Sequence, residues 1–284
     1  MSRAADLSPL SQLMRRVDAV SDGAPPPDSV PTGFPSVDRL LGGGLRLGDL
    51  VVIGGDTASG KSALALAIAL RMTQERGGKA AAFYSGEMSA ERVLERVLAI
   101  EGRARIDDLR RGTLDDGARA GVGAAALRMR DVLPIVDAVP DRGLDAIEEE
   151  LDGLEVKLIV VDPLQALAAG ARHPEEEAAA AVVRLKTLAR TRGVAVLVTA
   201  PLPGHRPDRA DPRPRLEDFG ALGAVRQHAD VVLGLYREEM YHTQGAEGAT
   251  ELLALKNRNG AAGYVDLYFY KQWMRFEDML DPDR

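Results

Sequence analysis

The sequence contains no cysteine. Disulfide bridges, thiolate metal sites and cysteine nucleophiles are therefore excluded. Histidine is also scarce, and the four histidines are scattered without metal-ligand spacing, so we interpret them as ordinary surface or core residues. They are His173, His205, His228 and His242.

The chain also lacks an excess of positive charge. Its formal net charge is −7, which argues against a basic nucleic-acid-binding surface over the whole molecule but leaves local basic patches open. No apolar run reaches the roughly 18 residues that a membrane span needs. Residues 1–6 lack the charged-then-apolar layout of a secretory signal, so we expect a cytoplasmic protein without a membrane partner.

The 284 residues suffice for one large domain and a short appendage. Residues 7–20 carry Leu10, Leu13, Met14, Val17 and Val20 on one helical stripe, and a proline-rich linker follows at 21–29. We therefore expect an amphipathic helix plus linker over 1–30 and the main domain over 31–284. The stripe leaves open whether this helix packs on its own domain or on a neighbouring subunit.

Strand-like and helix-like patterns alternate along the main domain, which predicts an α/β fold with a mostly parallel twisted sheet and helices on both faces. After residue 229 short strand-like runs follow one another, which predicts an antiparallel extension of that sheet. The expected parallel strands are 50–54, 79–85, 132–137, 156–161 and 194–199. The expected helices are 61–76, 89–101, 115–131, 143–152 and 175–192, and the late strands are 230–236, 250–256 and 263–270.

A phosphate-binding pattern, G-x-x-x-x-G-K-[ST], spans residues 55–62 between an apolar strand and a helix. Its glycines let backbone N–H groups surround phosphates, Lys61 would reach the β- and γ-phosphate oxygens, and Ser62 would ligate Mg²⁺. The expected nucleotide-binding residues are Gly55, Asp56, Thr57, Ala58, Ser59, Gly60, Lys61 and Ser62. The pattern predicts a site for a nucleoside triphosphate, taken to be ATP, with Mg²⁺.

Two carboxylates follow other apolar strands. Asp162 ends the run Leu158 to Val161, where ligands bind in open α/β sheets, and would support Mg²⁺; the alternative is a strand-terminal residue capping a turn. Glu87 follows the strand that ends at Tyr84 and is a candidate for activating the attacking water. On position alone, Glu87 is equally explained as a charge that favours the dipole of the helix beginning after Ser89.

The chain resembles the ATPase domain of DnaB-type replicative helicases, within the wider RecA-like group, in several stretches that run in order through most of the main domain. These are 32–40 (TGFPSVDRL), the phosphate loop with 63–67, 84–91 (YSGEMSAE), 158–165 (LIVVDPLQ), 229–239 (ADVVLGLYREE), 256–265 and 275–277. The opening block and 53–56 also resemble RadA-type repair ATPases, although the later blocks favour the DnaB side.

The resemblance implies a RecA-like phosphate-loop NTPase core and a homo-oligomeric ring, taken to be a hexamer, that acts on single-stranded DNA. It implies that Glu87 is the catalytic glutamate. It also implies that Lys256 and Arg258 reach into the ATP site of the next subunit, where an arginine neutralises charge on the transferring phosphoryl group. Without the resemblance, Lys256 and Arg258 would be interpreted as charges that protect a strand edge.

The chain departs from the family at two places. Pro201 stands where the family has a glutamine that reads the γ-phosphate, and proline offers no side-chain donor. Gly220-Ala221-Leu222 replaces the charged and hydroxyl residues of the family's DNA-facing loop. The preceding loop, 203–215, holds Arg206, Arg209, Arg213 and Arg215 and could track a nucleic-acid backbone instead, or simply be a solvated loop.

Three functional hypotheses follow. The first is a ring-forming, Mg²⁺-dependent ATPase that acts on single-stranded DNA. The second is a helicase-derived, ATP-dependent switch or assembly protein that does not unwind DNA, which the two departures favour. The third, a RadA-like repair ATPase, has less support, because the chain offers no cysteines for a zinc site.

Overall fold

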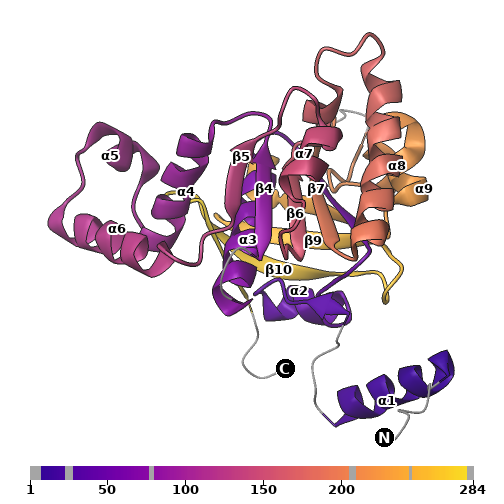
Figure 1. The fold of residues 1–284 in the computed structure, drawn as a ribbon. Helices are drawn as coiled ribbons and strands as arrows, with labels where there is room; N and C mark the ends of the chain where they lie inside the picture. Colours follow the sequence, from indigo (N-terminus) through magenta and orange to yellow (C-terminus); the bar gives the residue numbers. More distant parts are fainter. Residues whose placement is uncertain (1–7, 23–27, 77–79, 205–208, 243–244, 280–284) are drawn as a thin grey trace, which may run out of the picture.

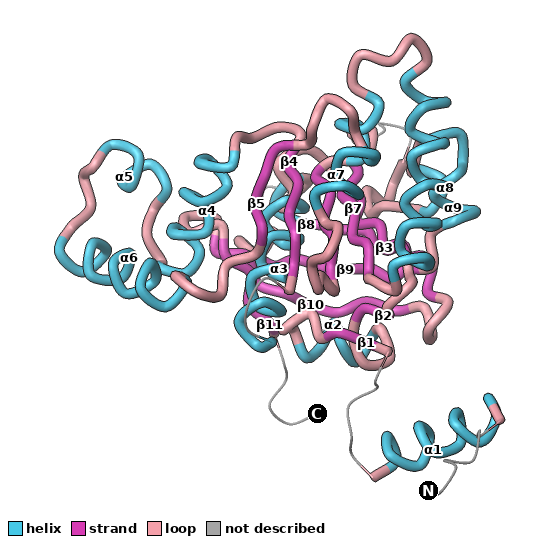
Figure 2. Tube along the Cα trace, in the orientation of Figure 1, coloured by secondary structure: helices cyan, strands magenta, loops and turns pink. Residues whose placement is uncertain are grey.

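The computed structural model describes residues 8–22, 28–76, 80–204, 209–242 and 245–279. In this part of the chain a nine-stranded sheet with the order β11-β10-β9-β8-β3-β7-β6-β4-β5 forms the centre of the molecule (Figures 1 and 2). Its strands are β3 (Leu50–Gly55), β4 (Ala81–Ser85), β5 (Ile135–Ala138), β6 (Leu158–Asp162), β7 (Ala195–Pro201), β8 (Val231–Arg237), β9 (Ala249–Asn257), β10 (Gly263–Tyr270) and β11 (Arg275–Asp278). A separate two-stranded sheet pairs β1 (Ser29–Val30) with β2 (Leu45–Arg46).

Helices cover both faces of the large sheet. They are α2 (Pro35–Leu40), α3 (Lys61–Arg76), α4 (Ala90–Gly102), α5 (Ile106–Arg111), α6 (Asp116–Met129), α7 (Leu144–Glu150), α8 (Pro174–Arg192) and α9 (Ala224–His228). Short 3₁₀ turns at Leu164–Ala168, Leu216–Asp218, Ala221–Gly223 and Glu238–Met240 connect several of these elements. None of the helices in the described ranges combines the length and apolar character that a bilayer crossing requires.

The expected architecture is confirmed. β3 pairs in parallel with β7 and β8, and β4 pairs in parallel with β5 and β6, whereas β8 to β11 pair antiparallel. The boundaries of the expected strands and helices agree with the structure within about three residues, as usual for element ends. The sequence interpretation did not include β1, β2, β11, α2, α5 or α9, all of which are short. Residue 79 of one expected strand lies outside the described residues.

Burial on both faces explains why the central strands are almost wholly apolar. Alternate residues of β3 enter two separate cores: Val51 and Ile53 pack with α3 and α4, whereas Leu50 and Val52 pack with α7, α8 and α9. The strand is therefore fixed from both sides, and the loop that follows its last residue, Gly55, is held at a defined place on the sheet edge.

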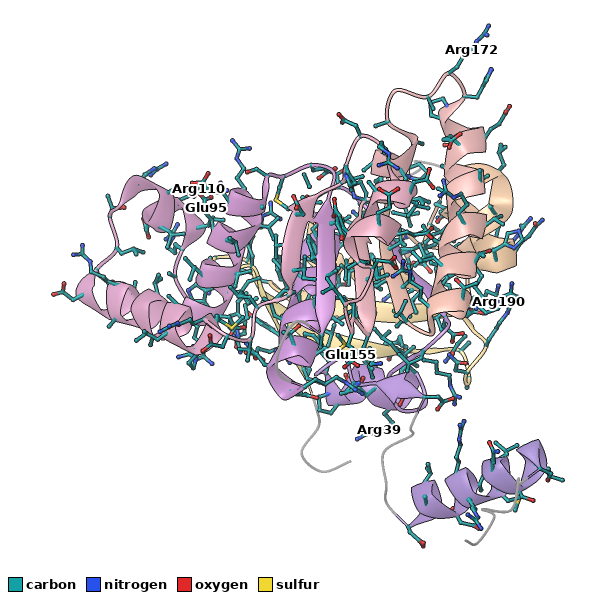
Figure 3. The ribbon with its side chains drawn as sticks, in the orientation of Figure 1. Arg39, Glu95, Arg110, Glu155, Arg172 and Arg190 are labelled. Atoms are coloured by element: carbon teal, nitrogen blue, oxygen red, sulfur yellow. The ribbon has the colours of Figure 1, made fainter. Side chains whose placement is uncertain are left out.

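Helices α4, α5 and α6 form a protrusion beside the β5 edge of the sheet (Figure 1). α4 and α6 pack together, and Arg110 of α5 makes an ion pair with Glu95 of α4, with 2.7 Å between Nε and Oε2 (Figure 3). This ion pair holds α5, which is only six residues long, against the protrusion.

An N-terminal helix, α1 (Pro9–Ser21), precedes the domain, close to the expected 7–20. Ser8 caps it by accepting a hydrogen bond from the Ser11 N–H at 3.2 Å, and a proline occupies its first turn. Its apolar stripe is exposed, and the helix lies apart from the sheet domain (Figure 1). The stripe consists of Leu10, Leu13, Met14, Val17 and Val20.

Candidate functional site: a phosphate loop at the sheet edge

The loop after β3 has the conformation that a phosphate loop requires. Gly60 has a φ of +105°, and a Cβ on it would lie 2.9 Å from the ring of Phe276, so glycine is required on both conformational and steric grounds. Helix α3 begins directly at Lys61. The Lys61 ammonium donates to the carbonyl oxygen of Asp56 at 2.8 Å and therefore lies across the loop. Backbone N–H groups, a helix N-terminus and one lysine together make an anion-binding cradle.

Asp162 lies at the end of β6 beside this cradle. Its Oδ1 accepts hydrogen bonds from the Ser62 hydroxyl at 2.9 Å and from the Thr199 hydroxyl at 2.5 Å. Its other oxygen, Oδ2, is buried and has no hydrogen-bond partner among the described residues. A buried carboxylate oxygen without a partner, next to a serine hydroxyl, has the ligand chemistry that Mg²⁺ prefers. These residues therefore fit a magnesium ion.

A cavity of about 420 Å³ lies beside the cradle. Glu87 lines it together with Lys61, Ser62 and Asp162. The turn that presents it is fixed by backbone contacts: the Gly86 N–H donates to the Asp162 carbonyl oxygen at 2.8 Å, and the Met88 N–H donates to the Ser85 hydroxyl at 3.0 Å. The Glu87 residue is exposed to the cavity. Its carboxylate is thus available to a water molecule beside the cradle.

Within the described part of the chain, four cationic residues line this cavity: Lys61, Arg96, Arg237 and Lys271. Burial lowers the pKa of Lys61, although the nearby carboxylates of Asp162, Asp56 and Glu87 oppose that effect. Burial also lowers the pKa of Arg96, from α4, and of Arg237, from the end of β8. An anionic ligand in the cavity would offset this cost of burying positive charge.

Arg237 also ties β8 to the phosphate loop. Its Nη1 donates to the carbonyl oxygen of Ala58 at 3.1 Å, its guanidinium lies 4.8 Å above the ring of Phe269, and it pairs with Glu239. On the other side of the loop, Asp56 accepts a hydrogen bond from the Tyr241 hydroxyl. The loop is therefore held from β8 and from the segment that follows it.

Lys256 and Arg258 are not brought to this cavity. Lys256 pairs with Val232 in the β8–β9 register, and β8 runs parallel to β3 with Val231 opposite Val51. Both basic residues thus lie at the starting end of β3, about 15 Å along the strand from the phosphate loop at its other end. β9 lies between β8 and β10, but its pairing with β10 ends at Ala254, so the interpretation of Lys256 and Arg258 as protection of a strand edge stays a prediction.

The departures from the family pattern are visible in the structure. Pro201 ends β7 and lines the nucleotide cavity. Ala221 and Leu222 have positive φ values of 54° and 50°, and the Ala221 N–H donates to Glu175 Oε2 of α8 at 2.7 Å. The loop that would have held the family's charged side chains therefore binds a carboxylate of its own chain.

Two arginines of the 203–215 loop are engaged in internal ion pairs. Arg209 contacts both oxygens of Asp218, at 2.8 and 2.5 Å, and Arg213 contacts both oxygens of Glu251, at 2.7 and 2.5 Å. Arg215 is exposed, and Arg206, like His205, lies outside the described residues. The two paired guanidiniums are already neutralised within the subunit, which favours the interpretation of a structured surface loop.

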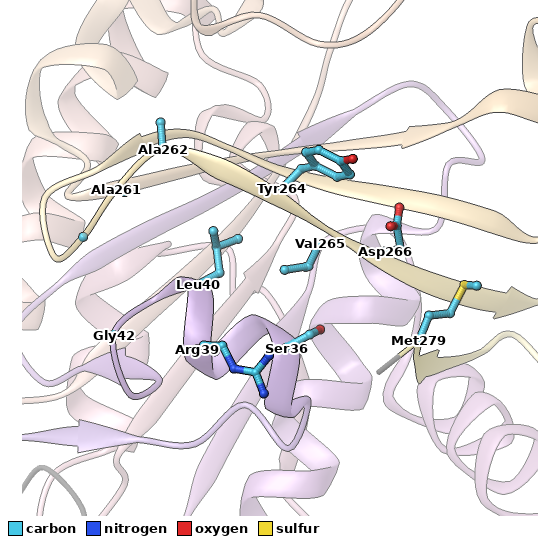
Figure 4. A pocket seen from close by; sticks show the side chains of 11 residues that line it. Ser36, Arg39, Leu40, Gly42, Ala261, Ala262, Tyr264, Val265, Asp266 and Met279 are labelled. Atoms are coloured by element: carbon cyan, nitrogen blue, oxygen red, sulfur yellow. The ribbon is translucent and has the colours of Figure 1, made fainter. Parts of the chain in front are cut away.

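A larger cavity, of about 690 Å³, lies elsewhere, between α2 and β10 (Figure 4). Leu40 and Val265 line it, and Tyr264 and Met279 are exposed at its margin. None of the expected nucleotide-binding residues contributes to it. Size alone would therefore point away from the phosphate loop, where the titratable groups and the backbone donors converge.

Sequence reasoning identified Asp162 and Glu87 but missed Thr199, Arg96 and Arg237. Two of the missed residues follow the same rule as Asp162, because Thr199 and Arg237 are polar residues near the ends of apolar strands that neighbour β3. Arg96 lies in the middle of a helix and carries no comparable sequence signal.

The parallel sheet, the cradle after its central strand and the carboxylate beside it define a phosphate-loop protein with a RecA-like core. The chain belongs to the family of DnaB-like helicase C-terminal domains, whose family model matches residues 29–278. That family consists of NTP-hydrolysing ATPase domains, so nucleotide binding is a family property.

Curated relatives agree with this assignment. The chain is 31% identical to the replicative DNA helicase DnaB of Leifsonia xyli subsp. xyli and 30% identical to that of Geobacillus stearothermophilus, in each case over 88% of the chain. The matches cover 56% of either relative, so the chain spans about half the length of these helicases.

Solved structures agree on the fold. A solved structure of a separate ATPase domain superposes with a TM-score of 0.82 at 23% identity, covering 95% of this chain and 98% of that one. A DnaB-like replicative helicase whose structure was described together with its interactions with primase gives the same score and identity, covering 66% of its own length. At this identity the likeness establishes the RecA-like fold.

Proposed function

We propose that the protein is a Mg²⁺-dependent ATPase that assembles into a ring, taken to be a hexamer, hydrolyses ATP at the interfaces between subunits and acts on single-stranded DNA. The observation that carries the proposal is the convergence of Ser62, Asp162 and Glu87 on the cradle that holds Lys61. Membership of the DnaB-like family supports it.

The roles of the residues follow from the geometry. Lys61 and the loop N–H groups would bind the β- and γ-phosphates, which would replace the Asp56 carbonyl as the partner of the lysine. Ser62 and Asp162 would hold Mg²⁺. When bound, the metal would neutralise charge on the phosphate oxygens. Glu87 would orient the attacking water and accept its proton.

Lys256 and Arg258 would act on the ATP of an adjacent subunit. They lie at the opposite end of β3 from the phosphate loop of their own chain, so a role in phosphoryl transfer requires a second subunit. There the guanidinium of Arg258 would neutralise the charge that develops on the transferring phosphoryl group. Each complete site would thus be built from two chains, which explains why we expect activity to require assembly.

The ATPase proposal is tested by measuring ATP hydrolysis with Mg²⁺ while the mass of the assembly is determined by light scattering. Glu87→Gln should lower kcat by about 10²- to 10⁴-fold with little change in KM, because the substitution removes the proton acceptor and leaves the cradle intact. The matched control is Glu91→Gln, an exposed carboxylate four residues further along, in the first turn of α4. Equal activity of the Glu87 and Glu91 variants would contradict the assigned role.

A second candidate, an ATP-dependent switch or assembly protein that does not unwind DNA, is favoured by the loop after β7. Arg209 and Arg213 are paired with Asp218 and Glu251, and Glu175 occupies the Ala221 N–H. Stimulation of hydrolysis by single-stranded DNA separates the two candidates: the helicase-like motor is stimulated, whereas the switch is indifferent. A RadA-like repair ATPase is supported only by the opening sequence block and residues 53–56.

A further inference from the structure

The turn that carries Arg258 is attached to the start of β3 by one buried carboxylate. Asp230, whose side chain is 6% exposed, accepts a hydrogen bond from Arg258 Nη1 on Oδ1 at 3.0 Å. Its Oδ2 accepts from the Leu50 N–H at 2.9 Å and from the Lys186 ammonium at 2.5 Å. A single side chain thus joins the turn, the first residue of the phosphate-loop strand, and α8.

Neighbouring contacts hold the same turn less directly. Asn259 donates to Asp49 at 2.8 Å, and the Lys256 ammonium donates to the carbonyl oxygens of Arg226 and Ala229 near the end of α9, at 2.8 and 2.5 Å. Asp230 is the carboxylate that contacts the Arg258 guanidinium itself. The Arg258 side chain nevertheless remains 52% exposed, so a ligand brought by another subunit can reach it.

We propose that Asp230 is the positioning residue for Arg258, setting the direction in which the guanidinium is presented to the phosphates bound by the neighbouring subunit. This inference rests on the proposed function, because it assumes that Arg258 acts in trans. A free arginine samples many rotamers. Here Asp230 holds Nη1, and the carbonyl oxygen of Gln227 accepts a hydrogen bond from Nη2 at 3.3 Å, so much of that freedom is removed before the neighbouring site forms. The remaining N–H groups of the fork then meet the ligand in a defined orientation.

The simpler account is that Asp230 only stabilises the fold, since it also neutralises Lys186 and binds a strand N–H. The two accounts differ in which subunit of an interface loses its active site. A positioning defect damages only the site of the neighbouring subunit and leaves the cradle of the altered chain competent. A folding defect damages the cradle of the altered chain as well, because Asp230 holds the strand that carries it.

Complementation between variants separates these accounts. Asp230→Asn, which is close to isosteric, should lower kcat by about 10- to 100-fold while KM stays near that of wild type. Co-expression with Glu87→Gln, with purification through a different tag on each chain, places an intact cradle beside an intact Arg258 at about one interface in four. With sites that act independently, the mixed assembly should therefore recover about a quarter of wild-type activity, compared with about a tenth or less for the Asp230→Asn parent and less still for the Glu87→Gln parent.

Two reference mixtures complete the design. Arg258→Ala with Glu87→Gln should recover activity in the same way, because the two defects lie on opposite sides of an interface. Asp162→Asn with Glu87→Gln should not, because both damage the cradle side. Melting temperatures measured for every variant report on folding, and Asp230→Glu, which keeps the charge but displaces it by one methylene, serves if the asparagine variant does not fold.

The outcomes are distinct. Recovery by Asp230→Asn or Asp230→Glu together with recovery by Arg258→Ala supports the positioning role. If Arg258→Ala recovers and neither Asp230 variant does, or if Asp230→Asn leaves kcat unchanged, the positioning role is overturned and the shared site stands. If Arg258→Ala itself fails to recover, the shared site is overturned and the positioning role falls with it.

Discussion

A Cβ atom added to Gly54 would lie 2.4 Å from the ring of Phe219. Gly54 is the penultimate residue of β3, and Phe219, which is 4% exposed, belongs to the segment between β7 and α9. The segment that follows β7 therefore packs directly against the base of the phosphate loop. The Phe219 ring can approach β3 this closely because residue 54 has no side chain.

Gly54→Ala should destabilise the protein by about 1–3 kcal/mol, because the phenyl ring and the strand cannot both keep their places. Phe219→Leu in the same chain should restore part of that loss by removing ring atoms. Denaturant unfolding provides the measurement. Gly123→Ala is the control, since Gly123 lies in α6 with nothing within 4 Å of an added Cβ, and this change should be neutral or stabilising.

Asp162→Asn should raise the Mg²⁺ concentration needed for half-maximal ATP hydrolysis and lower kcat. The asparagine side chain keeps an oxygen that can accept the hydrogen bond of the Ser62 hydroxyl. It lacks the negative charge of the carboxylate and replaces one of the two oxygens with an NH₂ group, which cannot bind Mg²⁺. A Mg²⁺ titration of the ATPase rate tests this, with the exposed Glu155→Gln as control. An unchanged midpoint would remove Asp162 from the metal site.

Arg258→Ala should inhibit wild-type protein when the two are mixed in one assembly. Each altered subunit disables the site of its neighbour, so activity should fall more than linearly with the fraction of altered chains if the sites around the ring fire cooperatively. The measurement is ATPase rate against mixing ratio at constant total protein. A strictly linear decline would show that the sites fire independently, because each altered chain then removes one site whether Arg258 acts on its own chain or on a neighbour.

Glu175→Gln should strengthen binding of single-stranded DNA by several-fold. The Glu175 carboxylate accepts the hydrogen bond of the Ala221 N–H, and its negative charge repels a phosphate group at the same loop. Fluorescence anisotropy of a labelled oligonucleotide at two salt concentrations measures the effect, and Glu176→Gln, an exposed neighbour, is the matched control. Equal affinities for the two variants would leave Glu175 with a structural role only.

Removal of residues 1–28 should lower the number of subunits in the assembly while the sheet domain stays folded. The exposed stripe of α1 has five large apolar side chains, which is enough to stabilise an interface if the helix docks on a neighbour. Light scattering gives the mass, and circular dichroism confirms the fold. The double change Leu13→Asp with Met14→Asp should act like the deletion, whereas Arg15→Gln should not. An unchanged number of subunits would show that α1 does not contribute to the assembly.

Local sequence patterns were sufficient to locate the phosphate loop, because Gly55, Gly60, Lys61 and Ser62 are consecutive or nearly so and lie between a strand and a helix. Asp162 and Glu87 were found because a carboxylate after an apolar run marks the ligand-binding edge of a parallel sheet. The alternation of β and α patterns likewise predicted a mostly parallel sheet covered by helices on both faces.

Other features depend on contacts between distant segments. Arg96 reaches the cavity from the middle of α4, and nothing in its local sequence distinguishes it from Arg92, the other arginine of that helix. β11 was missed because it is four residues long and largely charged, and because the turn before it uses Met274 at a φ of +51° instead of a glycine. The ion pairs of Arg209 and Arg213 depend on carboxylates that lie 9 and 38 residues away.

The placement of the cradle and of Arg258 at opposite ends of β3 has a geometric consequence for any assembly whose sites are shared as proposed. An open row of subunits leaves one cradle without a donor at one end and one Arg258 without a recipient at the other. A closed circle leaves neither. The rate of ATP turnover per chain should therefore be higher in a closed ring than in an open row of the same number of subunits. Breaking one interface of a closed ring should abolish hydrolysis at one site.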